Sequence, residues 1–83
     1  MSTESVIPTV AGGWLLVASA ADDKFLVENQ GSTPVLIHFA TSLPASDAAG
    51  HYLHPKVALP RMAAGNIYVR SLSDVGTRLI VSK

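Results

Sequence analysis

The sequence has no cysteine and few charged residues, and each absence removes a class of protein. Without cysteine no disulfide can form, and three histidines alone offer too few ligands for a structural zinc site. A domain of 83 residues buries only about 60% of the surface that its unfolded chain exposes, so its own core gives marginal stability. Association with other copies or with a larger assembly is therefore the expected source of further stability.

Charge is scarce and balanced along the whole chain. Six basic and six acidic residues give a formal net charge of zero, and no two basic residues are adjacent. This pattern argues against nucleic acid and anionic membranes as partners. The charged fraction of 14% lies below the roughly 25% of an average soluble domain, which favours contact with protein.

No segment resembles an export signal or a membrane span. Residues 1–5 carry no positive charge, and the apolar stretch 10–21 is interrupted by Gly12 and Gly13 and is too short to cross a bilayer. We therefore expect a protein that is made and used in a cytoplasm.

Short β-branched and aromatic segments alternate with turns rich in Gly, Pro, Ser and Asp. Strands are expected over residues 14–19, 24–30, 35–40, 51–54, 57–59, 66–71 and 77–82. An edge strand or an arm is expected over 6–10, because Pro8 excludes a central strand. The pattern predicts an all-β fold: a small antiparallel β-sandwich or barrel of six to seven short strands over residues 11–83, after a flexible N-terminal arm, residues 1–10.

Residues 25–39 are the most informative segment, because two apolar stretches flank the turn residues 31–34. They predict a hairpin, and residues 66–82 predict a second one that closes the domain. The strands carry apolar residues on both faces, and so small a chain has little protein with which to cover two faces. The expected core residues are Val35, Ile37, Phe39, Ile67 and Val69. The second face, expected to meet a partner, carries Trp14, Leu36, Tyr68 and Ile80.

Catalytic and metal-binding patterns are weak. His51 and His54 are three residues apart in an expected strand and so face opposite sides, which leaves only a metal ion shared between subunits as an alternative to two surface histidines. A nucleophilic triad could draw on Ser42 or Ser46, His38 or His51, and Asp47 or Asp74. The chain lacks the Gly-x-Ser-x-Gly elbow that would position such a serine, so we expect no enzyme activity and no cofactor.

Several segments together resemble small virion structural proteins of tailed bacteriophages. They are residues 25–31 (FLVENQG), 34–39 (PVLIHF), 42–47 (SLPASD), 50–53 (GHYL), 67–71 (IYVRS) and 79–81 (LIV), so that the resemblance spans about residues 14–82. Where such proteins have a Gly-rich turn after the strand at 51–53, this chain has Pro55, Lys56 and Val57.

The resemblance implies a structural role on a phage particle, assembled in the host cytoplasm. Capsid decoration or cementing is the first expectation, with the major capsid protein or another virion protein as partner and a homo-oligomer, in particular a trimer, as the bound form. A head-fibre or tail-fibre component is the alternative, with a receptor or glycan bound by Trp14 or Tyr52 beside Asn66 or Asp47. The candidate interface residues are Val6, Ile7, Val10, Trp14, Leu36, Tyr68, Arg70 and Ile80.

Overall fold

The computed structural model describes residues 3–22, 24–45, 47–61 and 63–83. Its strands are β1 (Thr3–Val6), β2 (Leu15–Ala18), β3 (Leu26–Asn29), β4 (Val35–Ala40), β5 (His51–Leu53), β6 (Ala58–Pro60), β7 (Asn66–Ser71) and β8 (Leu79–Ser82). The described ranges contain no helix, and hence none that is long and apolar enough to span a membrane.

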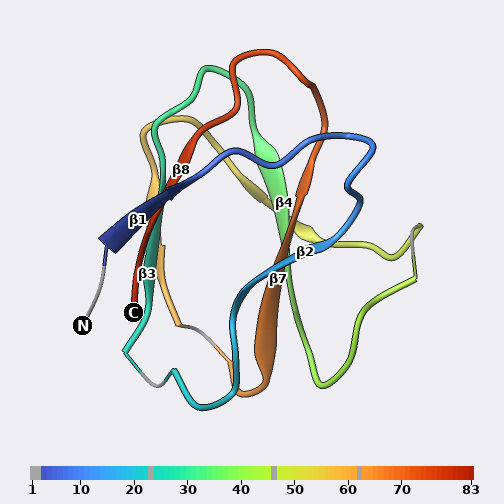
Figure 1. Ribbon diagram of the computed structural model, residues 1–83, viewed down its shortest axis with the longest axis vertical. Helices are drawn as coiled ribbons and strands as arrows, with labels where there is room; N and C mark the ends of the chain where they lie inside the picture. The colour runs from blue at the N-terminus through green and yellow to red at the C-terminus, as the bar shows by residue number, and fades with distance from the viewer. Residues whose placement is uncertain (1–2, 23, 46, 62) are drawn as a thin grey trace.

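The strands form two four-stranded antiparallel sheets that face each other (Figure 1). The first sheet has the order β1-β8-β3-β6 and the second sheet the order β2-β7-β4-β5. The all-β antiparallel prediction is confirmed. The expected number of strands was too low, since the described residues form eight, and the two separate sheets do not close into a barrel.

The two predicted hairpins do not form. Strands β3 and β4 lie in different sheets, and so do β7 and β8. The turns between them instead cross from one sheet to the other, over the roughly 10 Å that separates packed sheets. Among strands that follow each other in sequence, only β4 and β5 pair directly, and their connection is the long loop 41–50.

The two crossing turns support each other at one end of the molecule. The backbone N–H of Ser32 donates to the carbonyl of Gly76 at 2.7 Å, and that of Gln30 donates to the carbonyl of Arg78 at 2.9 Å. Gly31 is required here, because a Cβ at this position would lie 2.1 Å from the carbonyl oxygen of Gly76. Gly76 itself has a φ of +78°, in the left-handed region that favours glycine.

The core lies between the sheets, and its polar members among the described residues are Asn29, Ser71 and Thr77. Its main cluster contains Val17, Ala18, Phe25, Val27, Val35, Ile37, Leu53, Ile67, Val69, Leu79 and Val81. Burying each of the larger side chains contributes about 1.5–3 kcal/mol. The predicted core residues are confirmed: four of the five are buried, and the half-buried Phe39 packs against the cluster.

Arg61 ties the loops together at the opposite end. Its guanidinium donates four hydrogen bonds of 2.8–3.1 Å to backbone carbonyls. The acceptors are Ser19 and Asp22, in the β2–β3 connection, and Ala63 and Gly65, in the β6–β7 connection. A planar group with five donors suits this task, which the ammonium group of lysine could not perform from one position.

The N-terminal segment contains the first strand. Residues 3–6, within the expected arm, pair with β8 in a register that sets Thr3 opposite Ser82 and Val6 opposite Leu79. The strand begins earlier than the predicted edge strand over 6–10, and the chain leaves the sheet after Val6, just before Pro8. Met1 and Ser2, also within the expected arm, lie outside the described residues.

Candidate interaction surface

The eight candidate interface residues lie in four separate places. Val6 packs against the core, and Ile80 is on the outer face of the first sheet. Ile7 and Val10 are exposed in the loop after β1. The remaining four, Trp14, Leu36, Tyr68 and Arg70, belong to the second sheet or to its outer face.

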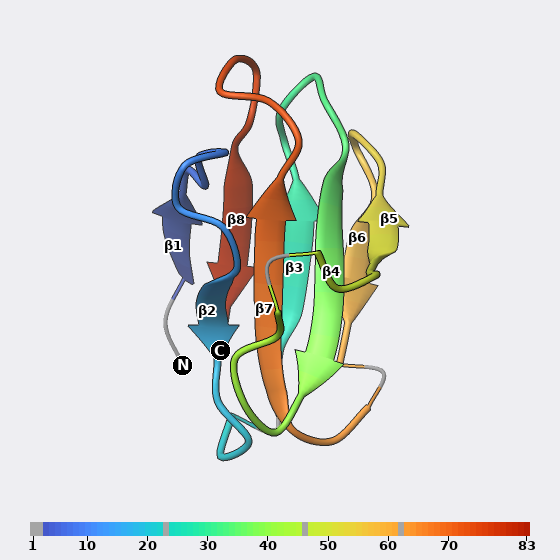
Figure 2. The ribbon, with the colours of Figure 1, turned by 90° about the vertical axis from the view of Figure 1, so that its right-hand side faces the viewer.

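The described parts of the chain's own loop 41–50 cross in front of β7 and β4, on the outer face of the second sheet (Figure 2). Trp14 is 7% exposed, and its indole N–H donates to the carbonyl of Ala45 at 3.0 Å. The Trp14 ring lies 5.4 Å from the ring of His38, whose Nδ1 is 2.7 Å from the carbonyl oxygen of Ala49. Gly50 comes so close that a Cβ there would lie 2.9 Å from the indole.

This arrangement differs from the expectation for two of the residues assigned to the partner-facing side. Trp14 and Tyr68 are buried within the chain itself, so neither side chain is exposed to anchor a partner. Leu36 and Arg70 lie opposite each other on the neighbouring row and are half-buried. A loop can fold back over the outer face of the strand that precedes it. The alternation of apolar residues within the strand does not predict this folding back.

Two neighbouring loops at one end of the molecule also carry exposed apolar side chains. Val75 is 77% exposed and Ile7 is 66% exposed, and Val10 and Leu72 are exposed beside them in sequence. We call these four residues, Ile7, Val10, Leu72 and Val75, the apolar end. Leu72 and Val75 were not predicted as interface residues, although two large apolar residues in an otherwise polar turn were a visible signal.

Hydrogen bonds join the two loops that carry the apolar end. The backbone N–H of Val10 donates to Oδ1 of Asp74 at 2.8 Å, and the hydroxyl of Thr77 donates to the carbonyl of Pro8 at 3.2 Å. The backbone N–H of Val75 donates to the Ser73 hydroxyl at 3.1 Å. The apolar side chains are therefore held out on braced loops, which lowers the entropy cost of binding a partner.

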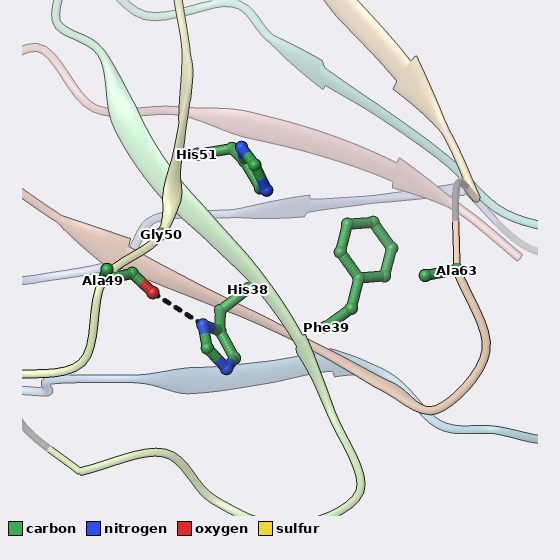
Figure 3. Close-up of a pocket in the computed structure, with 6 residues that line it drawn as sticks. All are labelled: His38, Phe39, Ala49, Gly50, His51 and Ala63. Atoms are coloured by element: carbon green, nitrogen blue, oxygen red, sulfur yellow. Dashed lines mark hydrogen bonds between the residues drawn. The ribbon is translucent and has the colours of Figure 1, made fainter.

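A shallow apolar cleft opens at the edge of the sandwich where β5 begins. Its volume is about 320 Å³, and it is lined by His38, Phe39, Ala49, Gly50, His51 and Ala63 (Figure 3). An adjoining cleft of about 430 Å³ shares Phe39, His51 and Ala63 and is otherwise lined mainly by aliphatic side chains. In Figure 3 the His38 ring turns toward Ala49, whereas Phe39 points toward Ala63. Among the described residues that line the cleft of Figure 3, none carries a carboxylate or a hydroxyl nucleophile.

The catalytic set considered from the sequence is not assembled in the described ranges. His38 is bonded to a backbone carbonyl, Asp74 is bonded to Val10 at the other end, and no hydrogen bond there joins a histidine to a carboxylate. Ser46 lies outside these ranges. Among the residues that the structure describes, no three His, Cys, Asp or Glu side chains are placed to hold one metal ion.

The exposed aromatic residue among those that the structure describes is Tyr52. It is 63% exposed and stacks on His54, with 6.0 Å between the ring centroids and 19° between the planes. His51 lies opposite Ile37, on the core side of β5, so the predicted separation of the two histidines on opposite sides of the strand is confirmed. Of the glycan-binding candidates, Trp14 is buried, and the Asn66 amide accepts from Ala20 and donates to Tyr68.

Comparison with known proteins adds no identity to this geometry. No protein-family model, no curated protein and no solved structure matches the chain.

Proposed function

We propose that the chain is a structural protein of a tailed-bacteriophage virion that decorates the capsid shell and binds it through the apolar end. The observation that carries the proposal is the exposure of Val75 and Ile7 on loops braced by hydrogen bonds to each other. Single exposed apolar residues are ordinary, but several at one end of a small domain are typical of a protein contact. The class of partner comes from the resemblance spread over residues 14–82.

The proposed mechanism is additive binding by many copies. A net charge of zero gives no long-range steering toward a charged surface, so short-range apolar contact must supply the affinity. One apolar end is a small contact and binds weakly on its own. On a shell that repeats the same site, each copy held by one contact has a high effective concentration for the next, and the coat becomes stable.

The test is co-sedimentation of the purified protein with heads that lack it. We expect the wild-type protein to saturate the heads at a fixed ratio to the major capsid protein. V75S and I7S each remove an exposed apolar side chain without touching the core, and each should weaken binding by about tenfold.

L43S is the matched control, because Leu43 is 67% exposed but lies in loop 41–50, away from the apolar end. It should bind like the wild type. Failure of the wild-type protein to sediment with heads would contradict the decoration role. Equal binding by V75S, I7S and L43S would reject the apolar end as the docking surface.

A head-fibre or tail-fibre component that binds a glycan is the second candidate, and the stack of Tyr52 on His54 favours it. An exposed aromatic face beside a polar ring is a suitable platform for a sugar. The measurement is binding to a glycan array by the wild type, Y52A and W14F. A signal lost in Y52A and kept in W14F would support this role, and no signal from the wild type would reject it.

A further inference from the structure

The two sheets differ in what covers their outer faces. Loop 41–50 crosses the outer face of the second sheet, whereas no described segment crosses the outer face of the first sheet (Figures 1 and 2). Thr3, Ser5, Leu26, Ala58 and Pro60 are all exposed on that first sheet. This flat surface is independent of the apolar end and of the proposed function.

The strand register shows how this face is built. One row runs Ser5, Ile80, Glu28 and Ala58, and the next row runs Thr3, Ser82, Leu26 and Pro60. Leu26 and Pro60 are direct neighbours in the second row, whereas Glu28 separates Ile80 from Ala58 in the first. Small hydroxyl side chains lie on the β1 side, where the Thr3 and Ser82 hydroxyls are 2.9 Å apart. The face therefore combines exposed apolar side chains with the Glu28 carboxylate among them.

Two opposite charges, Glu28 and Arg78, belong to the same face, and Glu28 lies within it, between Ile80 and Ala58. Glu28 lies opposite Ile80, and the ladder continues with a hydrogen bond from the Gln30 N–H to the carbonyl of Arg78. Arg78 is two residues from Ile80 and so points to the same side of the sheet. Glu28 accepts a hydrogen bond from the Gln30 amide, and the ion pair found in the described ranges joins Lys83 to Glu4, not Arg78 to Glu28.

We infer that this face binds the same face of a second copy across a two-fold axis, with Ile80 near the axis and Glu28 of each copy against Arg78 of the other. A two-fold contact is self-complementary, so Glu28 and Arg78 on a single face can satisfy each other twice. Stacking of one face on itself gives a pair of chains and not the trimer that the resemblance implies.

The contact must be weak in solution. The outer face of the first sheet fits within a rectangle whose sides are the 31 Å and 17 Å extents of the molecule. The area of this rectangle is smaller than the roughly 800 Å² of surface that each partner contributes to a standard interface. We expect a dissociation constant between about 10 μM and 1 mM. No capsid is needed for this association, so its test and the test of shell binding can fail separately.

The test is sedimentation equilibrium over a concentration series with E28R, R78E and their equimolar mixture. Each variant alone opposes like charges across the axis, and we expect at least about a tenfold weaker dimer. In a mixed pair, one chain carries two positive charges at these positions and the other carries two negative charges. Both contacts across the axis then join opposite charges, so the mixture should recover the wild-type dimer. D47R, which changes the same charge on loop 41–50, should dimerise like the wild type.

Three results would overturn the inference: a wild type that stays monomeric to about 1 mM, an oligomer that E28R and R78E leave unchanged, or a mixture that associates no better than its components. Thermal unfolding of each variant verifies that it folds. A second measurement needs no variant: amide chemical shifts of the wild type as its concentration rises. Changes over residues 26–30, 58–60 and 78–82 support the contact, and changes confined to other strands reject it.

Discussion

The side-chain amide of Asn29 donates a hydrogen bond of 2.9 Å to the carbonyl of Leu53, and this bond links the two sheets through the interior. The same amide donates to the carbonyl of Thr33 at 2.9 Å, and its oxygen accepts from the N–H of Gly31 at 2.9 Å. Asn29 is fully buried with all of these partners satisfied. One side chain thus fixes both the crossing turn after β3 and the end of β5.

N29D tests this role, because it keeps the shape of the side chain and removes both donors. We expect a loss of about 3 kcal/mol in the free energy of unfolding at pH 7, since two carbonyls lose their partner and a carboxylate is buried. The measurement is urea unfolding followed by circular dichroism. N66D is the control: the Asn66 amide donates over 3.3 and 3.5 Å at a less buried site, so its loss should be under about 1 kcal/mol. Equal losses would contradict the assigned role.

The strands could be predicted from the sequence, but their pairing could not. The bounds of β4 and β7 agree with the predicted 35–40 and 66–71, because alternation of apolar residues is a local signal. Alternation also identifies Val35, Ile37, Ile67 and Val69 as core. It does not say which sheet a strand joins, so turns that cross between sheets have the sequence pattern of hairpins.

The exposed and buried residues of the outer surfaces were harder to predict for a related reason. Trp14 and Tyr68 follow the strand pattern of an outer face, and the loop that buries Trp14 supplies its hydrogen-bond acceptor 31 residues away in sequence. The apolar end, conversely, comes from two loops that are joined by the bond between Val10 and Asp74, 64 residues apart. Contacts of such range depend on the whole topology.

The covering of the second sheet by loop 41–50 predicts an effect of W14F. Phenylalanine keeps most of the buried ring but cannot donate to Ala45, so we expect a loss of about 1 kcal/mol and faster amide hydrogen exchange within the loop. Mass spectrometry of exchange by peptide segment measures the second effect. Y52F removes a hydroxyl from an exposed ring and should change neither quantity. Unchanged exchange in W14F would show that the indole bond does not hold the loop.

The contact between the two crossing turns predicts that Gly31 cannot be replaced. In G31A the new methyl group would meet the Gly76 oxygen at 2.1 Å and the Arg78 nitrogen at 2.9 Å, and both are backbone atoms that cannot rotate away. We expect a loss of at least about 2 kcal/mol in the free energy of unfolding.

G12A is the matched substitution in the loop after β1. There the methyl group would lie 3.1 Å from the Thr9 hydroxyl oxygen, which belongs to a side chain that can adjust. Its effect should stay within about 0.5 kcal/mol. If chemical denaturation gave both variants the same stability, the stacking of the two turns would not limit the fold.

Asp22 caps the turn after β2 and has a lowered pKa. The backbone N–H of Ser19 donates to Oδ2 of Asp22 at 2.9 Å, which is the largest cause holding the pKa of this carboxyl below its ordinary value of 3.8. The Ser19 hydroxyl, 3.3 Å away, acts in the same direction, and so do the positive charges of Lys83 and Arg61, while desolvation opposes them.

The lowered pKa fixes the pH dependence of D22N. A carboxyl with a lower pKa in the folded state stabilises the fold above its unfolded pKa, and this contribution is lost as the pH falls through the folded value. D22N should therefore be less stable than the wild type at pH 7, and the difference should shrink below pH about 4. Thermal unfolding of both proteins at a series of pH values measures this. A difference between D22N and the wild type that stays constant from pH 7 down to about 2 would mean that the carboxylate charge does not stabilise this turn.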